Sequence, residues 1–382
     1  MRELVLSEDE FTEFSVPHAL CLAGEHQYSL GLAPIVIATN LRVHAGVEET
    51  AEEFQIGLAD ERAAAGSSLK LLARWRAVLE ELAGGEAERM EGLRITLRLQ
   101  ATGDGCPPEI TLPSPAVAVA LACAVRTHRG PGGTVPDTEM AELAAGLLRE
   151  FNPSSRMHPD RFYAECLVSL QGGAWYVSSA ADSLNVQLMV PPESLILAVS
   201  READAGAGGG AWEAVLLSAL RKMGRSAAEL LDATERDASR LFELAPSGLD
   251  EREMAVLYGQ LRVREMIAQH LERLWQPLLD HDLLAELCDE ESTIIEDYFE
   301  FPAARYHDVR TRAMESGALG AKFTYAFGTQ PAMIILAPGR RDEVKEVLEG
   351  EFHGCSFMSV DVDPEGAGAS QVQETDDAPG WE

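Results

Sequence analysis

The sequence predicts an α+β protein of two domains or one large two-lobed unit. The chain has 382 residues, of which 46% are hydrophobic, and this is enough for a large core and for more than one typical domain. Apolar and polar residues alternate in residues 93–100, as in a half-buried strand, whereas apolar residues recur every three or four residues in 69–82, as in a helix. Both patterns occur in each half of the chain, which favours a mixed fold.

The charge balance argues against several classes of partner. The chain carries 31 basic and 63 acidic residues, a formal net charge of −32, so it repels nucleic acid and anionic membrane surfaces. No apolar run is long enough to span a bilayer, and the N-terminus lacks the basic-then-apolar pattern of a secretion signal. The six cysteines include no close pair, which argues against a zinc site and a disulfide framework and favours a reducing cytoplasm.

One short stretch holds polar residues in a pattern typical of a ligand site. The apolar residues 17–23 lead into Gly24, and Glu25, His26 and Tyr28 follow. Glycine permits a sharp exit from a buried strand, and polar groups at a strand end can be directed at a ligand. A strand, a turn and two solvated polar residues are the simpler interpretation of the same pattern.

A second stretch, residues 104–120, is typical of a loop that leads into an apolar helix. Pro115 suits the first turn of that helix, because the N–H that proline lacks has no partner within the helix there. Ser114 directly precedes it, and Thr111 lies in the loop. The pattern predicts a helix N-terminus with hydroxyl groups beside it.

A third stretch, residues 156–162, places an acidic residue beside a basic residue at the start of a predicted helix. Asp160 is followed by Arg161, and the simpler interpretation of Asp160 is a helix N-cap. His158, Pro159 and Asp160 also spell the tripeptide of J-domain cochaperones. That domain needs an unbroken basic helix before the tripeptide, whereas the preceding helix here is acidic and is broken at Pro153.

Together with a fourth stretch, these motifs resemble those of the GHMP small-molecule kinases in their galactokinase version. The fourth stretch runs Gly320-Ala321-Lys322-Phe323-Thr324 and continues to Phe327-Gly328. The resemblance covers roughly residues 11–360. It implies a two-lobed GHMP-kinase fold, with a ribosomal-protein-S5-like lobe over residues 1–178 and a ferredoxin-like lobe over 179–360. We expect residues 361–382 to form an acidic disordered tail.

The resemblance also implies a chemistry: ATP-dependent transfer of a phosphoryl group to a sugar hydroxyl, with ATP and Mg²⁺ as cofactors. In this interpretation Asp160 is the catalytic base, and Arg161 either keeps it ionised or replaces the family's cation, whose position Ser15 occupies. The substrate-binding residues implied are Gly24, Glu25, His26 and Tyr28. The nucleotide-binding residues implied are Ser114 and Thr111. The partners are then small molecules, in the setting of carbohydrate metabolism.

Departures from the family pattern support an alternative, a catalytically inactive relative that binds a sugar or nucleotide or regulates a partner. Residues 109–111 stand where the phosphate loop has glycines, and Pro113 and Pro115 stand at serine positions, so only Ser114 remains. Proline cannot donate an N–H to a phosphate. Tyr325 stands among the glycine positions of the fourth stretch, where we expect its ring to fill space beside the substrate. The sequence predicts neither the substrate's identity nor the oligomeric state.

Overall fold

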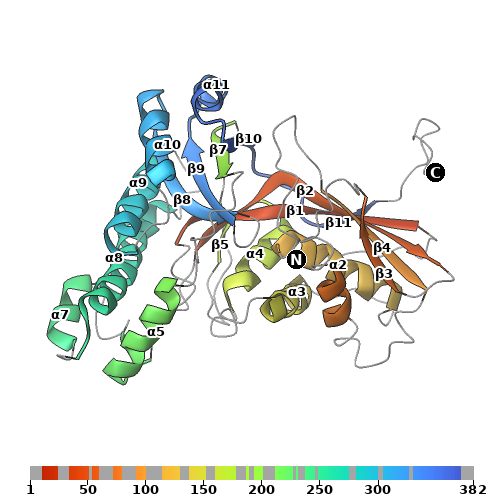
Figure 1. Cartoon of the computed structure of the whole chain (residues 1–382), viewed down its shortest axis with the longest axis horizontal. Helices are drawn as coiled ribbons and strands as arrows, with labels where there is room; N and C mark the ends of the chain where they lie inside the picture. The colour runs from red at the N-terminus through yellow and green to blue at the C-terminus, as the bar shows by residue number, and fades with distance from the viewer. Residues whose placement is uncertain are drawn as a thin grey trace.

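The structure is a computed structural model, and its elements form two sheets that are covered by helices (Figure 1). None of the described helices is long and apolar enough to cross a membrane. The residues described are 11–24, 34–50, 54–59, 72–79, 92–99, 114–129, 137–151, 160–177, 186–188, 193–200, 211–226, 229–230, 237–245, 248–274, 281–299, 304–326 and 330–370.

Within these residues the first sheet has seven strands. Five follow the order β11-β1-β2-β4-β3, and β5 and β6 extend the sheet from β2. All neighbours are antiparallel except β3 and β4. The strands are β1 (Phe11–Ala23), β2 (Ile35–Glu49), β3 (Gln55–Leu58), β4 (Leu93–Leu99), β5 (Ala174–Tyr176), β6 (Val186–Leu188) and β11 (Gly368–Ser370). Because β6 pairs with β5, this sheet extends past residue 178, where the sequence predicted the lobe boundary.

Three helices lie on one face of the first sheet: α2 (Pro115–Arg129), α3 (Asp137–Phe151) and α4 (Asp160–Gln171) (Figure 1). Both α2 and α4 contact β1 and β2. The N-terminal part of α2 is made of alanine, valine, leucine and cysteine, and residues 114–124 are all buried. Residues 72–79 are helical as predicted, and Trp75 is fully buried in the same core.

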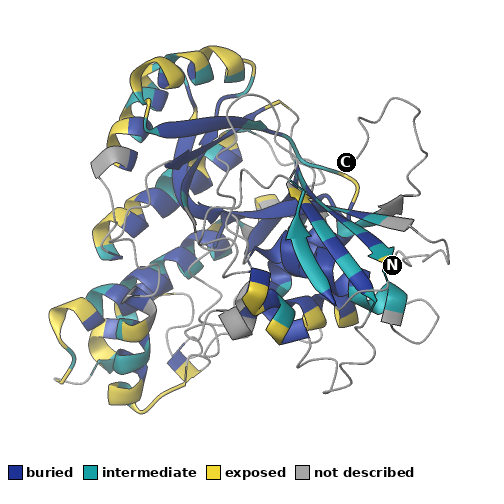
Figure 2. Ribbon diagram, turned by 45° about the vertical axis from the view of Figure 1, so that its right-hand side comes forward, coloured by how far each residue is buried: buried dark blue, intermediate teal, exposed yellow. Residues whose placement is uncertain are grey.

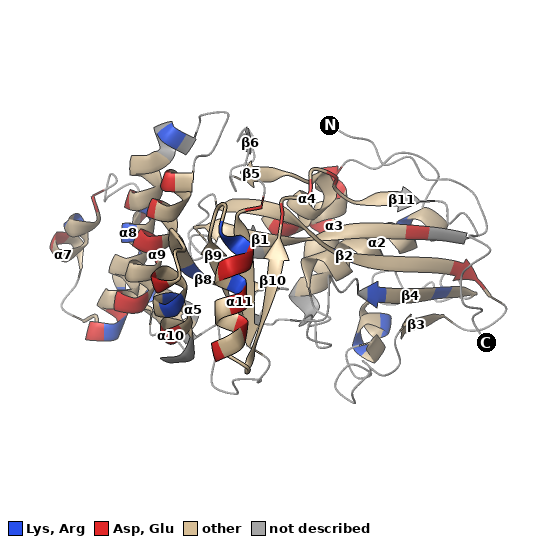
Figure 3. Cartoon of the chain, turned by 90° about the horizontal axis from the view of Figure 1, so that it is seen from above, with Lys and Arg blue, Asp and Glu red and all other residues tan. Residues whose placement is uncertain are grey.

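The second sheet has four antiparallel strands in the order β10-β7-β9-β8. Its strands are β7 (Leu195–Ser200), β8 (Gly320–Ala326), β9 (Gln330–Leu336) and β10 (Cys355–Val360). The helices of this lobe are α5 (Ala211–Met223), the 3₁₀ helix η5 (Ala238–Arg240), α7 (Leu241–Leu244), α8 (Glu251–Leu274), α9 (His281–Tyr298), α10 (Ala304–Glu315) and α11 (Arg341–Glu351). Charged residues are frequent on α8 to α11 and sparse on α2 (Figure 3).

Strand alternation divides the interior into separate cores, because successive side chains point to opposite faces. In β7, Ile196 packs in a core with α10 and α11, whereas Leu197 packs in a core with α5, α8 and α9. In β1, Cys21 belongs to the core with α2, α3 and α4, whereas Leu20 and Leu22 belong to the second-lobe core. Figure 2 shows buried residues in both sheets. Because neighbouring residues of β1 pack in cores of different lobes, the end of β1 lies where the lobes meet.

Residues 361–370, here called the C-terminal strap, correct the prediction of a disordered tail. The strap leaves β10 of the second lobe and returns to the first sheet, where β11 pairs with β1 in the register Ser15↔Gly368. Gly366 lies so close to the end of α4 that a Cβ there would stand 1.8 Å from the Leu170 carbonyl oxygen. Residues 371–382 of the predicted tail lie outside the described residues.

The strap is held by hydrogen bonds to backbone N–H and C=O groups of β2 that do not pair with β1. Between Pro17 and Ala19 of β1 the pairing register shifts from Arg42 to Ala38 of β2. Strap atoms occupy this gap: Asp361 O accepts from Asn40 N at 3.0 Å, and Asp363 N donates to Ala38 O at 2.9 Å. An acidic, glycine-containing composition gave no sign of these long-range bonds.

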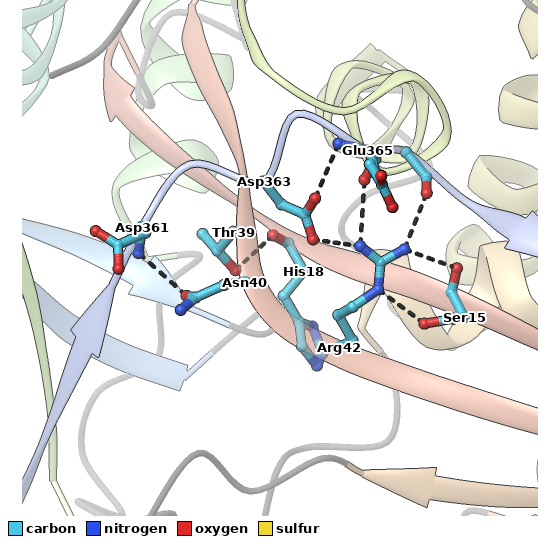
Figure 4. A network of polar contacts seen from close by, with 9 residues as sticks. Ser15, His18, Thr39, Asn40, Arg42, Asp361, Asp363 and Glu365 are labelled. Atoms are coloured by element: carbon cyan, nitrogen blue, oxygen red, sulfur yellow. Dashed lines mark hydrogen bonds and ion pairs between the residues drawn. The ribbon is translucent and has the colours of Figure 1, made fainter. Parts of the chain in front are cut away.

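Arg42 fastens the strap through its guanidinium group (Figure 4). Its Nε donates to Ser15 Oγ at 2.7 Å, its Nη2 donates to Gly366 O at 2.9 Å, and its Nη1 forms an ion pair with Asp363. These contacts join β1, β2 and the strap at one point. Hydrogen bonds to a charged group are among the stronger ones in proteins.

Candidate functional site

The candidate site begins where β1 ends. Gly24 follows the last residue of the strand and has φ +81°, a left-handed conformation that glycine adopts without strain. The sharp exit predicted from the sequence is therefore present. Glu25, His26 and Tyr28, which we predict to bind substrate, lie outside the described residues.

A buried carboxylate from the second lobe holds Gly24. The Gly24 N–H donates to both oxygens of Glu291 on α9, at 3.0 and 3.1 Å. Lys322 on β8 donates to Glu291 Oε2 at 3.0 Å. Both side chains of this ion pair are fully shielded from solvent. The exit of β1 is thus fixed by a helix and a strand that lie far away in the sequence.

The side chains of β8 point alternately toward β1 and toward α10. Thr324, two residues after Lys322, donates from Oγ1 to the Cys21 carbonyl of β1 at 3.4 Å. Phe323 and Tyr325 face the other way and form an aromatic group with Tyr306 of α10, with ring centroids 5.1 and 5.6 Å from Phe323. The Tyr325 ring therefore fills space in the core against α10, on the face of β8 opposite to Thr324, because strand alternation turns it there.

The start of α2 is closed by its own cap. Ser114 is fully buried, its Oγ accepts the Val117 N–H at 3.3 Å, and its carbonyl accepts the Ala118 N–H at 3.0 Å. Pro115 has no N–H, so beyond these bonds the first turn adds only the Ala116 N–H as a donor. The positive end of the helix dipole suits a phosphate, but the donor set described here is small. Thr111 lies outside the described residues.

Asp160 and Arg161, the predicted catalytic pair, are the first two residues of α4. Their side chains lie outside the described part of the chain. The helix itself lies on the same face of the sheet as α2, and both helices contact β1 (Figure 1). The N-terminus of a helix favours an ionised carboxylate, which is compatible with the role predicted for Asp160.

Two buried groups near the exit of β1 stay neutral. Burial lowers the pKa of His18, within β1, to about 3. Burial also raises the pKa of the Cys288 thiol, one turn before Glu291 on α9, to about 12. Neither is therefore suited to be a proton carrier or nucleophile near neutral pH. Over the described ranges, no group of three or more His, Cys, Asp or Glu residues could hold a metal ion.

The sequence analysis missed Glu291, although the sequence carries a signal for it. The buried face of α9 includes Leu284, Leu287, Glu291 and Ile295, which recur at helical spacing. An acid in such a stripe must be paired if it is buried. Lys322 appeared in the fourth motif, but nothing in the sequence connected it to Glu291.

Comparisons with known proteins give a structural match without a sequence match. No family model matches the sequence, and no curated protein matches it. A solved structure of Lactococcus lactis galactokinase complexed with galactose has a TM-score of 0.70 and 14% identity, and the match covers 94% of this chain and 95% of that one. Mevalonate kinase from L. major, in complex with R-mevalonate, has a TM-score of 0.60 and 13% identity, with 92% and 96% covered. Homoserine kinase from Cytophaga hutchinsonii has a TM-score of 0.57 and 15% identity, with 95% and 98% covered.

The chain has the GHMP-kinase fold. The match runs over nearly the whole length of each of these three kinases, so the GHMP fold accounts for both lobes and for the crossing between them. The predicted α+β, two-lobed fold class is confirmed. At 13–15% identity the likeness establishes the GHMP fold alone, and the chemistry has to be argued from the residues.

Proposed function

We propose that this protein is an ATP-dependent small-molecule kinase that transfers a phosphoryl group to a hydroxyl of a sugar or polyol. The observation that carries the proposal is the exit of β1, where Gly24 is held in place directly before Glu25 and His26. The likeness to galactokinase over 94% of the chain supports a sugar or polyol as the acceptor. Carboxylate and imidazole groups are natural hydrogen-bond partners for sugar hydroxyls.

In this proposal the protein mainly positions two substrates. Glu25, His26 and Tyr28 bind the acceptor, and Asp160 accepts the proton of the attacking hydroxyl while Arg161 keeps it ionised. Ser114, Thr111 and the positive end of α2 lie on the phosphate side. ATP supplies the phosphoryl group. Mg²⁺ binds largely through phosphate oxygens and water, so it arrives with the nucleotide.

The proposal is tested by incubating the chain with Mg-ATP and a panel of hexoses, pentoses and polyols. ADP release and the mass of the phosphorylated product are measured. Asp160→Asn should lower turnover by about 10²–10⁴-fold, the usual contribution of a general base. Asp137→Asn is the matched control, because Asp137 is the first residue of the neighbouring helix α3. Full turnover in Asp160→Asn would eliminate this residue as the base, and absence of ADP release with every acceptor would overturn the kinase proposal.

A second candidate is a relative that binds a sugar or nucleotide without transferring phosphate. The start of α2 favours it, because Pro115 lacks an N–H and Ser114 already accepts that of Val117. Thermal-shift titration separates the candidates. A sugar or Mg-ATP that raises the melting temperature without any ADP release favours the binding protein, whereas a shift accompanied by ADP release in the presence of the sugar favours the kinase.

A further inference from the structure

The ion pair at the exit of β1 is not explained by stability. Glu291 and Lys322 are both fully buried, and taking two charges out of water is costly. Apolar side chains of similar size usually stabilise a core as well as such a pair, or better. The pair formed by Glu253 and Lys222 is different, because Lys222 remains 44% exposed. A fully buried pair at a functional junction therefore suggests a role in setting geometry.

The ion pair provides a hydrogen-bond acceptor for a backbone N–H group, which an apolar pair could not provide. The two carboxylate oxygens of Glu291 lie 3.0 and 3.1 Å from Gly24 N, so the carboxylate accepts this backbone N–H. Lys322 donates to one of the same oxygens and compensates the negative charge. Gly24 has φ +81° and directly precedes Glu25 and His26 in the sequence, so this carboxylate holds the last described peptide before them.

We infer that Glu291 and Lys322 are positioning residues for the acceptor-binding turn that the sequence predicts after Gly24. Glu291 orients the Gly24 peptide from which the predicted turn starts, and Lys322 holds the Glu291 carboxylate in place. Thr324, on the same face of β8 as Lys322, adds a second tie from the second lobe to β1 through the Cys21 carbonyl. The second lobe thus sets the acceptor geometry of the first. The inference rests on the proposed function only for its effect on catalysis, because the orientation of the turn can be measured without turnover.

The decisive experiment compares two neutral double variants. Glu291→Gln with Lys322→Met keeps an oxygen that can accept the Gly24 N–H, whereas Glu291→Met with Lys322→Met removes it. Both remove both charges and approximately conserve volume, so both are expected to fold. Amide hydrogen exchange is followed by mass spectrometry in the peptide that spans residues 22–28. We expect exchange there to rise by about 10-fold or more in the Met/Met variant and to stay near the wild-type rate in the Gln/Met variant.

Kinetics then connect the turn to the acceptor. With whichever sugar or polyol the panel identifies, the Met/Met variant should raise the acceptor KM by about 10-fold and leave the ATP KM unchanged, because only the acceptor side is misplaced. Glu253→Gln is the matched control, since it removes another buried carboxylate that contacts α5 rather than β1. It should change neither the exchange of residues 22–28 nor the acceptor KM.

The outcomes separate this inference from the proposed function. Equal exchange in the Met/Met variant, the Gln/Met variant and the wild type would overturn the positioning role, whether or not the protein is a kinase. Raised exchange in Met/Met with no turnover in any protein would support the positioning role and overturn the kinase proposal. Raised exchange with an unchanged acceptor KM would overturn the link between this turn and the acceptor.

Discussion

The exit of β1 and the start of α2 are both buried, yet they are built in different ways. At the exit of β1, a glycine N–H from the first lobe meets a carboxylate and an ammonium group from the second lobe. At the start of α2, Ser114 satisfies the helix from within, and the surrounding residues are apolar. The first arrangement depends on contacts between lobes, whereas the second is complete within four residues of one helix.

This difference separates the two ends of the candidate site. The conformation of Gly24 is held by the distant elements α9 and β8. The start of α2 is capped by a residue beside its own first turn, and the described donors there are few.

The largest effect is expected from breaking the pair at the exit of β1. Lys322→Met removes the ammonium partner of the fully buried Glu291, and this should lower the free energy of unfolding by about 3–5 kcal/mol. Urea denaturation of the wild type and of Lys322→Met measures this loss of unfolding free energy. Lys222→Met is the control, because this partly exposed lysine should contribute about 1 kcal/mol or less. A loss below 1 kcal/mol in Lys322→Met would mean that the pair is not a determinant of the fold.

A slightly smaller effect is expected at the other end of β1, where the strap is fastened. Arg42→Gln removes charged hydrogen bonds to Ser15, Gly366 and Asp363 and should lower the free energy of unfolding by about 2–3 kcal/mol. Arg98→Gln on the adjacent β4 is the control, because its side chain is 53% exposed and pairs with Glu13 at the surface. Equal losses in the two variants would show that the strap is not held by Arg42.

His18, between these two ends of β1, should make stability depend on pH. Its pKa is about 3 when folded, against 6.5 for an ordinary histidine, so the unfolded chain binds the extra proton. Its contribution is fully present above pH 6.5 and decreases as the pH falls toward 3, by about 2 kcal/mol between pH 6.5 and 5. Denaturation of the wild type and of His18→Gln at both pH values measures this, and the variant should show the shallower dependence. Parallel curves would contradict the prediction.

The smallest effect is expected at the start of α2. Ser114→Ala removes the cap of the Val117 N–H and should lower the free energy of unfolding by about 1 kcal/mol. Thr127→Ala is the matched control in the same helix, because its hydroxyl bonds only to the Cys123 carbonyl one turn back. If Ser114→Ala lowers the free energy of unfolding as much as Lys322→Met does, the contrast between the start of α2 and the exit of β1 is wrong.

Much of the fold could be predicted because many of its helices and strands follow from the pattern of apolar and polar residues along short stretches of sequence. The apolar run of α2, the alternation of β4 and the helical spacing around Trp75 each depend on neighbouring residues. The order of the four motifs then predicted the GHMP fold, although identity to the matched kinases is only 13–15%. Gly24 was predicted for the same reason, since a glycine after a short apolar run indicates a strand exit.

The rest could not be predicted because it depends on contacts between distant residues. Gly24 and Glu291 are 267 positions apart, and Arg42 and Asp363 are 321 apart. The packing of Tyr325 in the core against α10 could not be predicted either, because the motif comparison considers the position and not the side-chain alternation of β8. Asp160 and Arg161 remain predictions, since only their place at the start of α4 is described.

The strap has a consequence for how the protein is made. β11 covers the edge of β1 in the finished molecule, yet β1 is synthesised near the beginning of the chain and β11 more than 300 residues later. While the ribosome produces the second lobe, that edge of β1 has unpaired backbone groups and is open to wrong pairing. Until β11 emerges, residues 13–15 lack the strand that pairs with this edge of β1, and the growing chain can pair wrongly there.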